Sequence, residues 1–221
     1  MNVASLFSGG KDSVFSIYIA KQWGWNITHL VTIMPKRKDS WMFHSLNIDQ
    51  TKKIAKALDI QYINKISEGN KEEEVQDLKD ILRDLEIDGI ISGAIDSEYQ
   101  RTRIEKICHD LKIKSFTPLW HKDQMKIIDE QIKAGFKIMI VGVSAFGLDE
   151  KWLGKYLDKK FINDIGKLSK KYKINIAGEG GEYETITLDG PIFKKKLIID
   201  NYSIKWRRDS GFLNIEESHL E

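Results

Sequence analysis

Short apolar runs alternate with helical patterns over the first 143 residues of the chain. Runs of strand length begin near residues 2, 26, 60, 89, 114 and 136, and a segment with helical spacing of apolar residues follows each of the first five. In the segment Asn47–Leu58, for example, Ile48, Ala55 and Leu58 fall on one helix face. This alternation predicts an α/β fold with a doubly wound, mostly parallel sheet and helices on both faces, and we count the run Phe136–Val143 with that sheet.

The pattern changes after Val143. The segment Leu148–Tyr172 is helical and rich in lysine, and the residues from about Glu216 are expected to form a tail. Between them, antiparallel strands are predicted at Thr185–Leu188, Lys196–Asp200, Tyr202–Arg207 and Phe212–Ile215. We therefore expect a nucleotide-binding domain at 1–143 and a smaller α+β lobe at 144–221, which would bind the second substrate.

Composition narrows the class of protein. The 221 residues are 41% hydrophobic, which is enough for a real core, and no apolar run approaches the roughly 20 residues of a membrane span. Only one cysteine is present, Cys108, so the chain cannot form an internal disulfide or a cysteine-based zinc site. These features, with no signal peptide in the opening residues, predict a cytoplasmic protein.

The charge is nearly balanced. The chain has 35 Lys and Arg residues and 33 Asp and Glu residues, for a formal net charge of +2, so no nucleic-acid partner is expected. Only six of the 35 basic residues are arginine, which makes two arginines close together informative. The lysines of 151–171 are interpreted as a solvated face. A homo-oligomer would be compatible with the small second lobe.

The stretch "SGGKDS" follows the first predicted strand directly. It lacks the spacing of a Walker A loop, yet its glycines permit close backbone approach, its serines supply hydroxyls, and a helix N-terminus follows. An aspartate beside phosphate makes sense if a divalent cation lies between them, so the loop predicts a nucleotide with Mg²⁺. The candidate nucleotide-binding residues here are Ser8, Gly9, Gly10, Lys11, Asp12 and Ser13, with Asp12 as the magnesium ligand. The alternative is a tight turn whose glycines serve geometry alone.

A second candidate segment begins on the fourth predicted strand, at "ISGAIDSEYQRTR". Gly93 would give a tight turn and Ser97 would cap the next helix. Its further candidates are Tyr99 and Gln100 for nucleotide binding, and Arg101 and Arg103 for charge on the phosphates. The alternative for the arginines is a helix surface on which Arg101 pairs with Glu98 or Glu105.

The stretch "GEGGEYET" places three glycines and three glutamates around one tyrosine. It suits neither a helix nor a strand, so it is either a flexible acidic loop or a rigid anionic pocket. A pocket of carboxylates and an aromatic ring fits a cationic ligand, including quaternary ammonium. The candidate substrate-binding residues are Glu179, Gly180, Gly181, Glu182, Tyr183, Glu184 and Thr185.

Together with "MFHSLN", "PLW" and "DGPIFKKKL", these stretches resemble the diphthine–ammonia ligase family of the PP-loop ATP pyrophosphatases. The resemblance implies a ligase that uses ATP and ammonium to amidate the carboxylate of diphthine, a modified histidine of translation elongation factor 2, and releases AMP and pyrophosphate. It implies magnesium held through Asp12, phosphate charge offset by Arg101 or Arg103, and a trimethylammonium group near the glutamates. His44 lies in the family's H-x-x-N segment, where the implied roles are contact with phosphate or deprotonation of ammonium.

Two other functions fit part of the pattern. Another PP-loop adenylating enzyme, such as one that modifies tRNA, would share the loop. The lack of cysteines for sulfur chemistry, the balanced charge and the acidic stretch "GEGGEYET" disfavour this alternative. A non-catalytic ATP-binding regulator would also bind nucleotide, but it would not need a full set of charge-neutralising residues.

Overall fold

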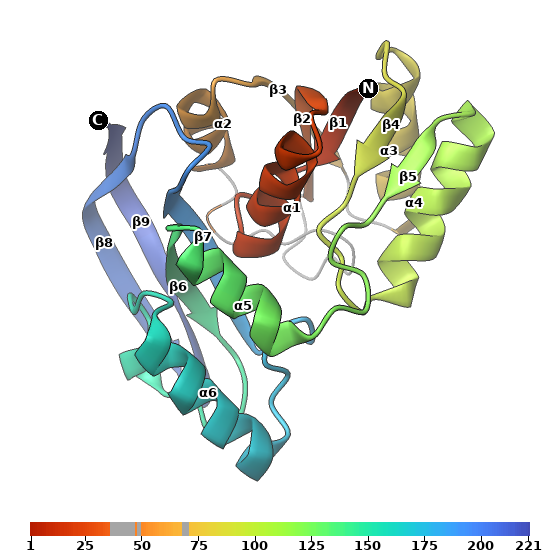
Figure 1. Ribbon diagram of the computed structural model, residues 1–221. Helices are drawn as coiled ribbons and strands as arrows, with labels where there is room; N and C mark the ends of the chain where they lie inside the picture. The colour runs from red at the N-terminus through yellow and green to blue at the C-terminus, as the bar shows by residue number, and fades with distance from the viewer. Residues whose placement is uncertain (36–46, 48–49, 68–70) are drawn as a thin grey trace.

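The computed structural model describes residues 1–35, 47, 50–67 and 71–221. The N-terminal part builds a five-stranded sheet in the order β3-β2-β1-β4-β5, and every neighbouring pair runs parallel (Figure 1). Its strands are β1 (Asn2–Leu6), β2 (Asn26–Pro35), β3 (Gln61–Ser67), β4 (Gly89–Ile91) and β5 (Lys114–Phe116). The order reverses at β1, so the loop after β1 lies at the switch point where such sheets bind ligands.

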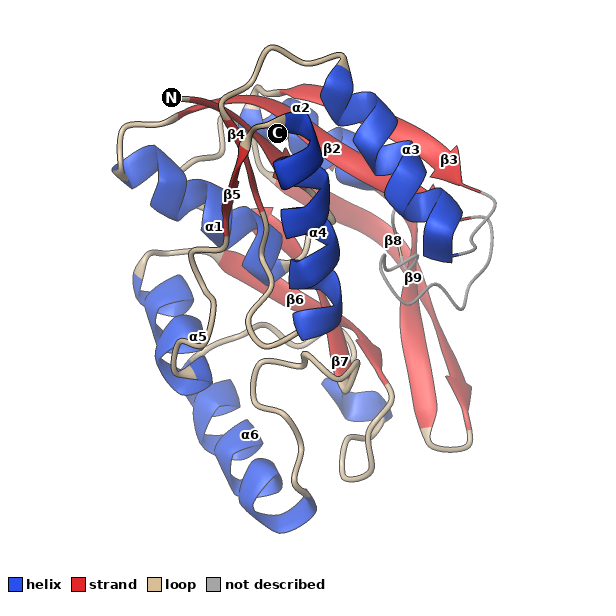
Figure 2. Cartoon of the chain, turned by 90° about the vertical axis from the view of Figure 1, so that its right-hand side faces the viewer, coloured by secondary structure: helices blue, strands red, loops and turns tan. Residues whose placement is uncertain are grey.

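Helices cover both faces of this sheet, as the alternating pattern predicts. They are α1 (Lys11–Gln22), α2 (Thr51–Leu58), α3 (Lys71–Arg83) and α4 (Glu98–Leu111), whereas α5 (Gln124–Lys133) packs against the C-terminal part of the chain. Leu78 of α3 and Ile107 of α4 share one apolar cluster with Ile90 of β4, whereas α1, α2 and α5 contribute to a second cluster. Figure 2 shows α3 and α4 on the near face of the sheet. The doubly wound fold is therefore confirmed.

The C-terminal part forms a four-stranded antiparallel sheet in the order β7-β6-β9-β8. It consists of β6 (Lys137–Val143), β7 (Tyr183–Asp189), β8 (Leu197–Arg207) and β9 (Ser210–Leu220), together with the short 3₁₀ helix η2 (Glu150–Trp152) and α6 (Lys159–Tyr172). None of the helices in the described part of the chain has the length and hydrophobicity that a membrane crossing requires.

Sequence reasoning assigned β6 to the wrong sheet. Gly142 of β6 pairs with Glu184 of β7 and with Phe212 of β9, so β6 is central in the antiparallel sheet. Six of its seven residues are buried, and a strand buried on both faces has the same apolar pattern in either kind of sheet. Sheet membership alone does not fix a domain boundary, so the division at residue 144 stays a prediction.

Three further differences lie in the second lobe. The helix expected over Leu148–Tyr172 begins only at Lys159, where the Asp158 carboxylate accepts a hydrogen bond from the Phe161 amide at 2.7 Å. The two strands expected around residue 201 form one strand, β8, with an irregular register there. The expected tail from Glu216 belongs to β9, because the residues up to Leu220 pair with β8.

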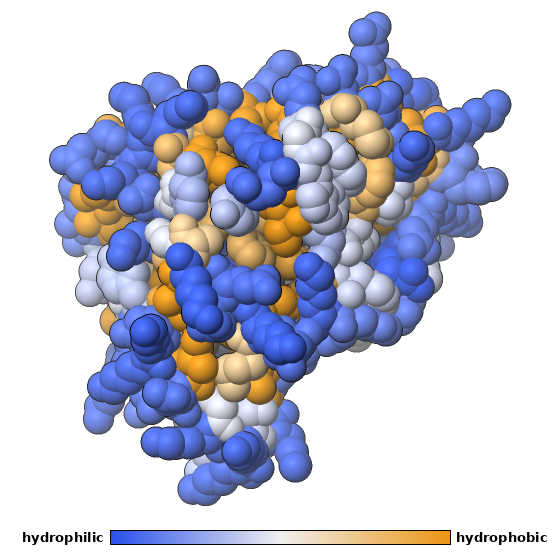
Figure 3. All heavy atoms as spheres, viewed as in Figure 1, coloured by the Kyte–Doolittle hydropathy of each residue, from blue (hydrophilic) through white to orange (hydrophobic). Residues whose placement is uncertain are grey.

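One apolar cluster joins the two sheets. It runs from Val3 of β1 and Ile17 of α1 to Ile140 of β6 and Leu213 of β9. Asn47 adds a polar link, because its amide donates to the Leu213 carbonyl at 2.8 Å and accepts from the Ile215 amide at 3.1 Å. On the face seen in Figure 3, hydrophilic side chains cover the periphery and hydrophobic atoms are visible in a central band.

Truncation of Ile140, which is fully buried in the shared cluster, is expected to destabilise the whole chain. Ile140→Ala should lower the free energy of unfolding by about 2–5 kcal/mol, because it removes buried methyl groups and leaves a cavity. Ile66→Ala is the control, since Ile66 is 59% exposed, and should change it by about 0.5 kcal/mol or less. Urea unfolding followed by circular dichroism and tryptophan fluorescence measures both. Equal losses for the two variants would contradict the shared core.

Candidate active site

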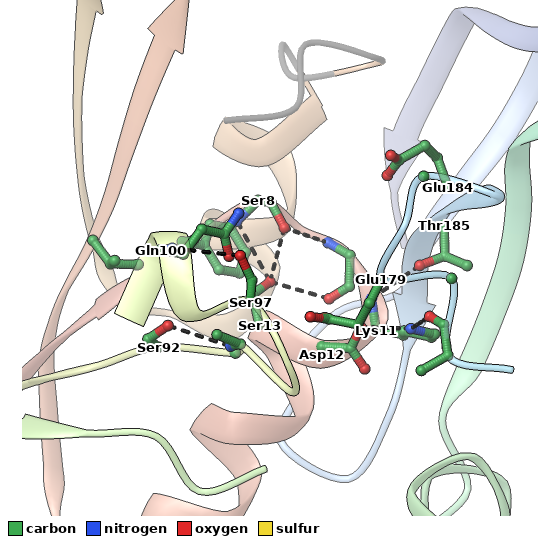
Figure 4. Close-up of a pocket in the computed structure, with 18 of the residues that line it drawn as sticks. Ser8, Lys11, Asp12, Ser13, Ser92, Ser97, Gln100, Glu179, Glu184 and Thr185 are labelled. Atoms are coloured by element: carbon green, nitrogen blue, oxygen red, sulfur yellow. Dashed lines mark hydrogen bonds and ion pairs between the residues drawn. The ribbon is translucent and has the colours of Figure 1, made fainter. Parts of the chain in front are cut away.

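A cavity of about 500 Å³ opens at the carboxyl ends of β1, β2 and β4. Its walls come from the loop after β1, the segment 92–100 and the segment 177–185 that precedes and begins β7. Figure 4 shows these three segments converging, with Ser8, Asp12 and Ser13 facing Glu179 and Thr185 across the space. The structure thus brings the "SGGKDS" and "GEGGEYET" stretches to one site, although more than 160 residues separate them in sequence.

The loop 8–13 is folded around its own hydrogen bonds. Gly9 has a φ of +75°, where a side chain would be strained, and an added Cβ would lie 2.7 Å from Ile54. The Ser8 hydroxyl accepts from the Gly10 amide at 3.3 Å, and the Ser13 hydroxyl donates to the Gly10 carbonyl at 3.1 Å. Gly10 precedes α1 and has no side chain, so it supplies no side-chain cap to the amides of the first turn.

The loop is joined directly to the second sheet. The Thr187 amide donates to the Gly9 carbonyl at 2.9 Å, and the Lys11 amide donates to the Thr185 hydroxyl at 3.2 Å. The Lys11 ammonium is buried and donates to the Ala177 carbonyl and the Asp12 carboxylate, both at 2.5 Å. It also lies 5.5 Å from the ring centroid of Tyr183. Lys11 therefore ties the two stretches together as well as lining the cavity.

Gln131 of α5 is a site residue that sequence reasoning missed. Its side-chain amide donates to the Asp12 carboxylate at 3.2 Å and to the Lys11 carbonyl at 3.4 Å. Gln131 is fully buried, and its own carbonyl oxygen has no hydrogen-bond partner among the described residues. The Asp12 carboxylate is therefore oriented by Gln131 at one oxygen and by the Lys11 ammonium at the other. A glutamine on a helix far from the glycine loop carries no local sequence signal that could have indicated this role.

The segment 92–100 packs closely against α1. A Cβ on Gly93 would lie 2.8 Å from the Ser13 amide nitrogen, so the close approach requires glycine here. Ser97 caps α4 by accepting from the Gln100 amide at 3.4 Å, and both residues line the cavity. Ser92, which sequence reasoning passed over, lines it as well.

The arginines and Tyr99 are not among the residues that line the cavity. Arg101 forms ion pairs with Glu98 at 3.2 Å and Glu105 at 2.8 Å, as in the surface alternative. Arg103 lies over the Tyr99 ring, with its guanidinium carbon 3.5 Å from the ring centroid, and donates to the Tyr99 carbonyl. A catalytic role for Arg101 or Arg103 stays a prediction. His44 lies outside the described residues.

The "GEGGEYET" loop is held by an internal network of hydrogen bonds. Asn175 accepts from the Ala177 and Glu179 amides, at 3.0 and 3.2 Å. The Glu182 carboxylate accepts from the Asn175 amide at 2.9 Å and the Gly180 amide at 2.8 Å. Glu182 therefore supports the loop and does not line the cavity, unlike Gly180, Gly181, Thr185 and the other two glutamates. Its carboxylate is correspondingly less suited to hold a ligand.

Tyr183 closes the inner side of the loop. Its hydroxyl donates to the Ile176 carbonyl at 2.7 Å, and burial raises its pKa well above the ordinary value, so the phenol stays neutral. Gly178 has a φ of +75°, and a Cβ there would lie 2.9 Å from the Tyr183 carbonyl oxygen. The loop needs glycine at this position because the chain folds back onto the tyrosine.

Glu179 reaches across to the other lobe. Its carboxylate accepts from the Asp96 amide at 3.1 Å and from the Ile95 amide at 3.4 Å. Partial burial raises the pKa of Glu179 above the ordinary glutamate value, and the negative charge of Asp12 adds to the increase. A carboxylate with a raised pKa inside a cavity is typical of a functional group.

The charge of the cavity lining is predominantly negative. The described lining contains three carboxylates, of Asp12, Glu179 and Glu184, and one basic side chain, Lys11. A bare triphosphate would be repelled by this set. The Asp12 carboxylate and the hydroxyls of Ser8 and Ser13 are hard oxygen donors of the kind that Mg²⁺ takes, so the residues present fit this ion.

Comparison with known proteins identifies the family. The N-terminal domain of diphthamide synthase matches residues 1–115, and its C-terminal domain matches residues 123–220. The chain is 35% identical to a diphthine–ammonia ligase of Danio rerio, over all of this chain and 97% of that protein, and 35% identical to one of Homo sapiens, over all of this chain and 93% of that protein. A diphthine–ammonia ligase of Schizosaccharomyces pombe is 33% identical over 92% of this chain and 37% of that protein. The chain therefore belongs to the diphthamide synthase family.

Proposed function

We propose that this protein is an ATP-dependent ligase that converts the diphthine carboxylate of translation elongation factor 2 to an amide, using ammonium, in the cytoplasm. The observation that carries the proposal is the cavity in which the glycine loop after β1 faces the acidic loop before β7. The first supplies amides, hydroxyls and a lysine for phosphates, and the second supplies carboxylates for cationic groups.

The reaction would proceed in two steps. An oxygen of the diphthine carboxylate attacks the α-phosphorus of ATP, the bond to the β-phosphate breaks, and pyrophosphate leaves with its electron pair. Ammonia then attacks the acyl carbon of the adenylate, AMP leaves, and the nitrogen gives up a proton to complete the amide. Magnesium, when bound, would supply positive charge that offsets the charge of the phosphates.

The chain's own residues can be assigned to these steps. Backbone amides at the start of α1 and the hydroxyls of Ser8 and Ser13 would bind the pyrophosphate portion, and the Lys11 ammonium would lie beside it. Asp12, oriented by Gln131, would hold the magnesium ion. Gly93 keeps the wall of the cavity close to α1 without covering the Ser13 amide.

The two glutamates that line the cavity would bind different cations. Glu179 lies near Asp12, and its raised pKa suits a group that attracts ammonium and accepts a proton from it. Glu184 lines both this cavity and a neighbouring hollow, so it lies toward the opening, where a protein side chain must enter. We assign Glu184 to the trimethylammonium group of diphthine.

The direct test measures AMP and the product together. The protein is incubated with Mg·ATP, ammonium and diphthine-bearing elongation factor 2, and the mass of the modified histidine is followed with AMP. Asp12→Asn should lower both rates by about 10²-fold or more, because it removes the charge that holds magnesium. Asp129→Asn is the control, since Asp129 pairs with Lys133 on the outer side of α5. AMP without a change in mass would indicate a different acceptor, and no AMP would favour an ATP-binding regulator.

Glu179→Gln is expected to lower the activity while slightly raising the thermal stability. The pKa of Glu179 is raised in the folded protein, so this carboxyl group loses its proton less readily in the folded state than in the unfolded chain. At a pH above the ordinary glutamate pKa, ionisation of Glu179 therefore favours the unfolded state. The neutral variant should therefore unfold at a slightly higher temperature at pH 7. It should also show about 10²-fold lower kcat, a higher KM for ammonium, and no acidic limb in its pH profile. In the wild type, the midpoint of that acidic limb should lie at a pH above the ordinary glutamate pKa. An acidic limb that is unchanged in the variant would exclude Glu179 as the titrating group.

Gln131→Met is expected to weaken nucleotide binding without unfolding the protein. The variant loses the donor that orients Asp12 but also removes a buried carbonyl oxygen that has no partner, so stability should change by about 1 kcal/mol or less. The KM for Mg·ATP should rise about tenfold, and the dependence on magnesium should shift to higher concentration. Gln131→Glu should weaken binding further at neutral pH and recover as the pH falls. A KM equal to that of the wild type in both variants would remove Gln131 from the site.

A further inference from the structure

A second hollow of about 300 Å³ lies next to the active-site cavity. The two share Gly181 and Glu184 in their walls, so the hollow continues from the opening of the cavity. Its other lining residues come from the end of β6 and from both strands of the β8–β9 hairpin, which Figure 2 shows projecting from the second sheet. The proposed reaction leaves this hollow without a role.

The floor of the hollow is a row of paired residues across all four strands. Glu184 of β7 is paired with Gly142 of β6, Gly142 with Phe212 of β9, and Phe212 with Lys205 of β8. Directly paired residues point to the same face of a sheet, so these side chains lie side by side on one surface. Gly142 has no side chain, and this leaves the surface concave between Glu184 and Phe212.

The two ends of the row carry opposite charges. Glu184 stands at the end nearest the active site, and Lys205 at the far end is joined on the same face by Arg207, two residues further along β8. The Lys205 ammonium lies over the Phe212 ring, 5.8 Å from its centroid. Within the described part of the chain, no ion pair or side-chain hydrogen bond joins Lys205 or Arg207 to another residue. Two exposed cations thus face a hollow that opens beside the active site.

A substrate that is a side chain of a protein brings its main chain to the opening of the cavity. We propose that the hollow binds the peptide segment next to the modified histidine, and that Lys205 and Arg207 bind a carboxylate side chain of that segment. This inference rests on the proposed function. In this arrangement Glu184 meets the trimethylammonium group at one end of the row while the two cations meet the carboxylate at the other.

A peptide fits the hollow better than a free phosphate or a nucleic acid. The carboxylate of Glu184 lies on the same surface and repels a phosphate chain that follows the row. The partly buried Phe212 ring contributes apolar surface, which a peptide can cover and a phosphate cannot. Opposite charges on one short row match a segment that carries a cation and an anion a few residues apart.

The test compares two double charge reversals in the full chain. Lys205→Glu with Arg207→Glu changes the hollow, whereas Lys167→Glu with Lys170→Glu makes the same change in charge on exposed positions of α6. The affinity for diphthine-bearing elongation factor 2 is measured without ATP at low salt, and kcat and KM for that protein and for ATP are measured separately. The first variant should weaken binding and raise the protein KM by about tenfold or more, with kcat at saturation and the KM for ATP within about twofold of the wild type. The α6 variant should stay within about twofold throughout.

The outcomes distinguish failure of the docking surface from failure of the proposed ligase activity. Equal weakening by both pairs, or no weakening by the first, would overturn the docking surface even if the wild type forms amide normally. Weaker binding by the first pair alone, with no amide formed by the wild type, would keep the docking surface and reject the ligase. A wild type that neither binds nor modifies the elongation factor would reject both. A changed KM for ATP or changed inhibition by pyrophosphate, with the protein affinity unchanged, would assign the cations to phosphate and overturn the proposal. Lys205→Met with Arg207→Met, which removes charge without reversing it, should give a smaller loss in the same direction.

Discussion

The attachment of the glycine loop to β7 is the constraint on which the rest of the site depends. The Gly9 carbonyl accepts from the Thr187 amide, and the Lys11 ammonium lies buried between the Asp12 carboxylate and the Ala177 carbonyl. A buried ammonium is tolerated only when oxygens surround it, because the loss of water would otherwise cost several kcal/mol. The position of the second sheet therefore determines the position of the loop, and the loop cannot bind phosphate in a fixed geometry unless both lobes are folded together.

This dependence explains why one apolar cluster runs through both sheets. If the lobes moved independently, Lys11 would lose the Ala177 carbonyl and Asp12 would face an ammonium without its other partners. The shared cluster and the contacts of Asn47 with β9 oppose such movement. Glu179 strengthens the connection from the other side, since its carboxylate binds amides that follow β4. The polar contacts position the residues of the site, and the apolar core keeps the two lobes in the arrangement that these contacts require.

The sequence predicted what local patterns determine. The parallel strands follow from apolar spacing, and the N-cap of α4 follows from Ser97. Both glycine-rich stretches indicate ligand loops, because glycine is needed where the backbone turns back or packs closely. Local patterns could not assign β6 to its sheet, because burial on both faces gives the same apolar run in parallel and antiparallel sheets. They also could not indicate Gln131 or show that Glu182 bonds its own loop, since both depend on contacts that only the folded chain creates. The pairing of Arg101 with Glu98 and Glu105 was open in the sequence because helical spacing alone permits it.

Charge is arranged along one path through the protein. The inner part of the cavity combines the glycine loop with Asp12 and Glu179, which suits a metal-bound polyphosphate and a small cation. Glu184 follows at the opening, and Lys205 and Arg207 lie beyond it on the same surface of the second sheet. A ligand that carried only negative charge would be repelled midway, and one that carried only positive charge would be repelled at the outer end. A protein segment that carries a cation and an anion would match Glu184 and the two cations at the outer part of this path, and for this reason the surface of the second sheet belongs in the same physical argument as the nucleotide loop of the first.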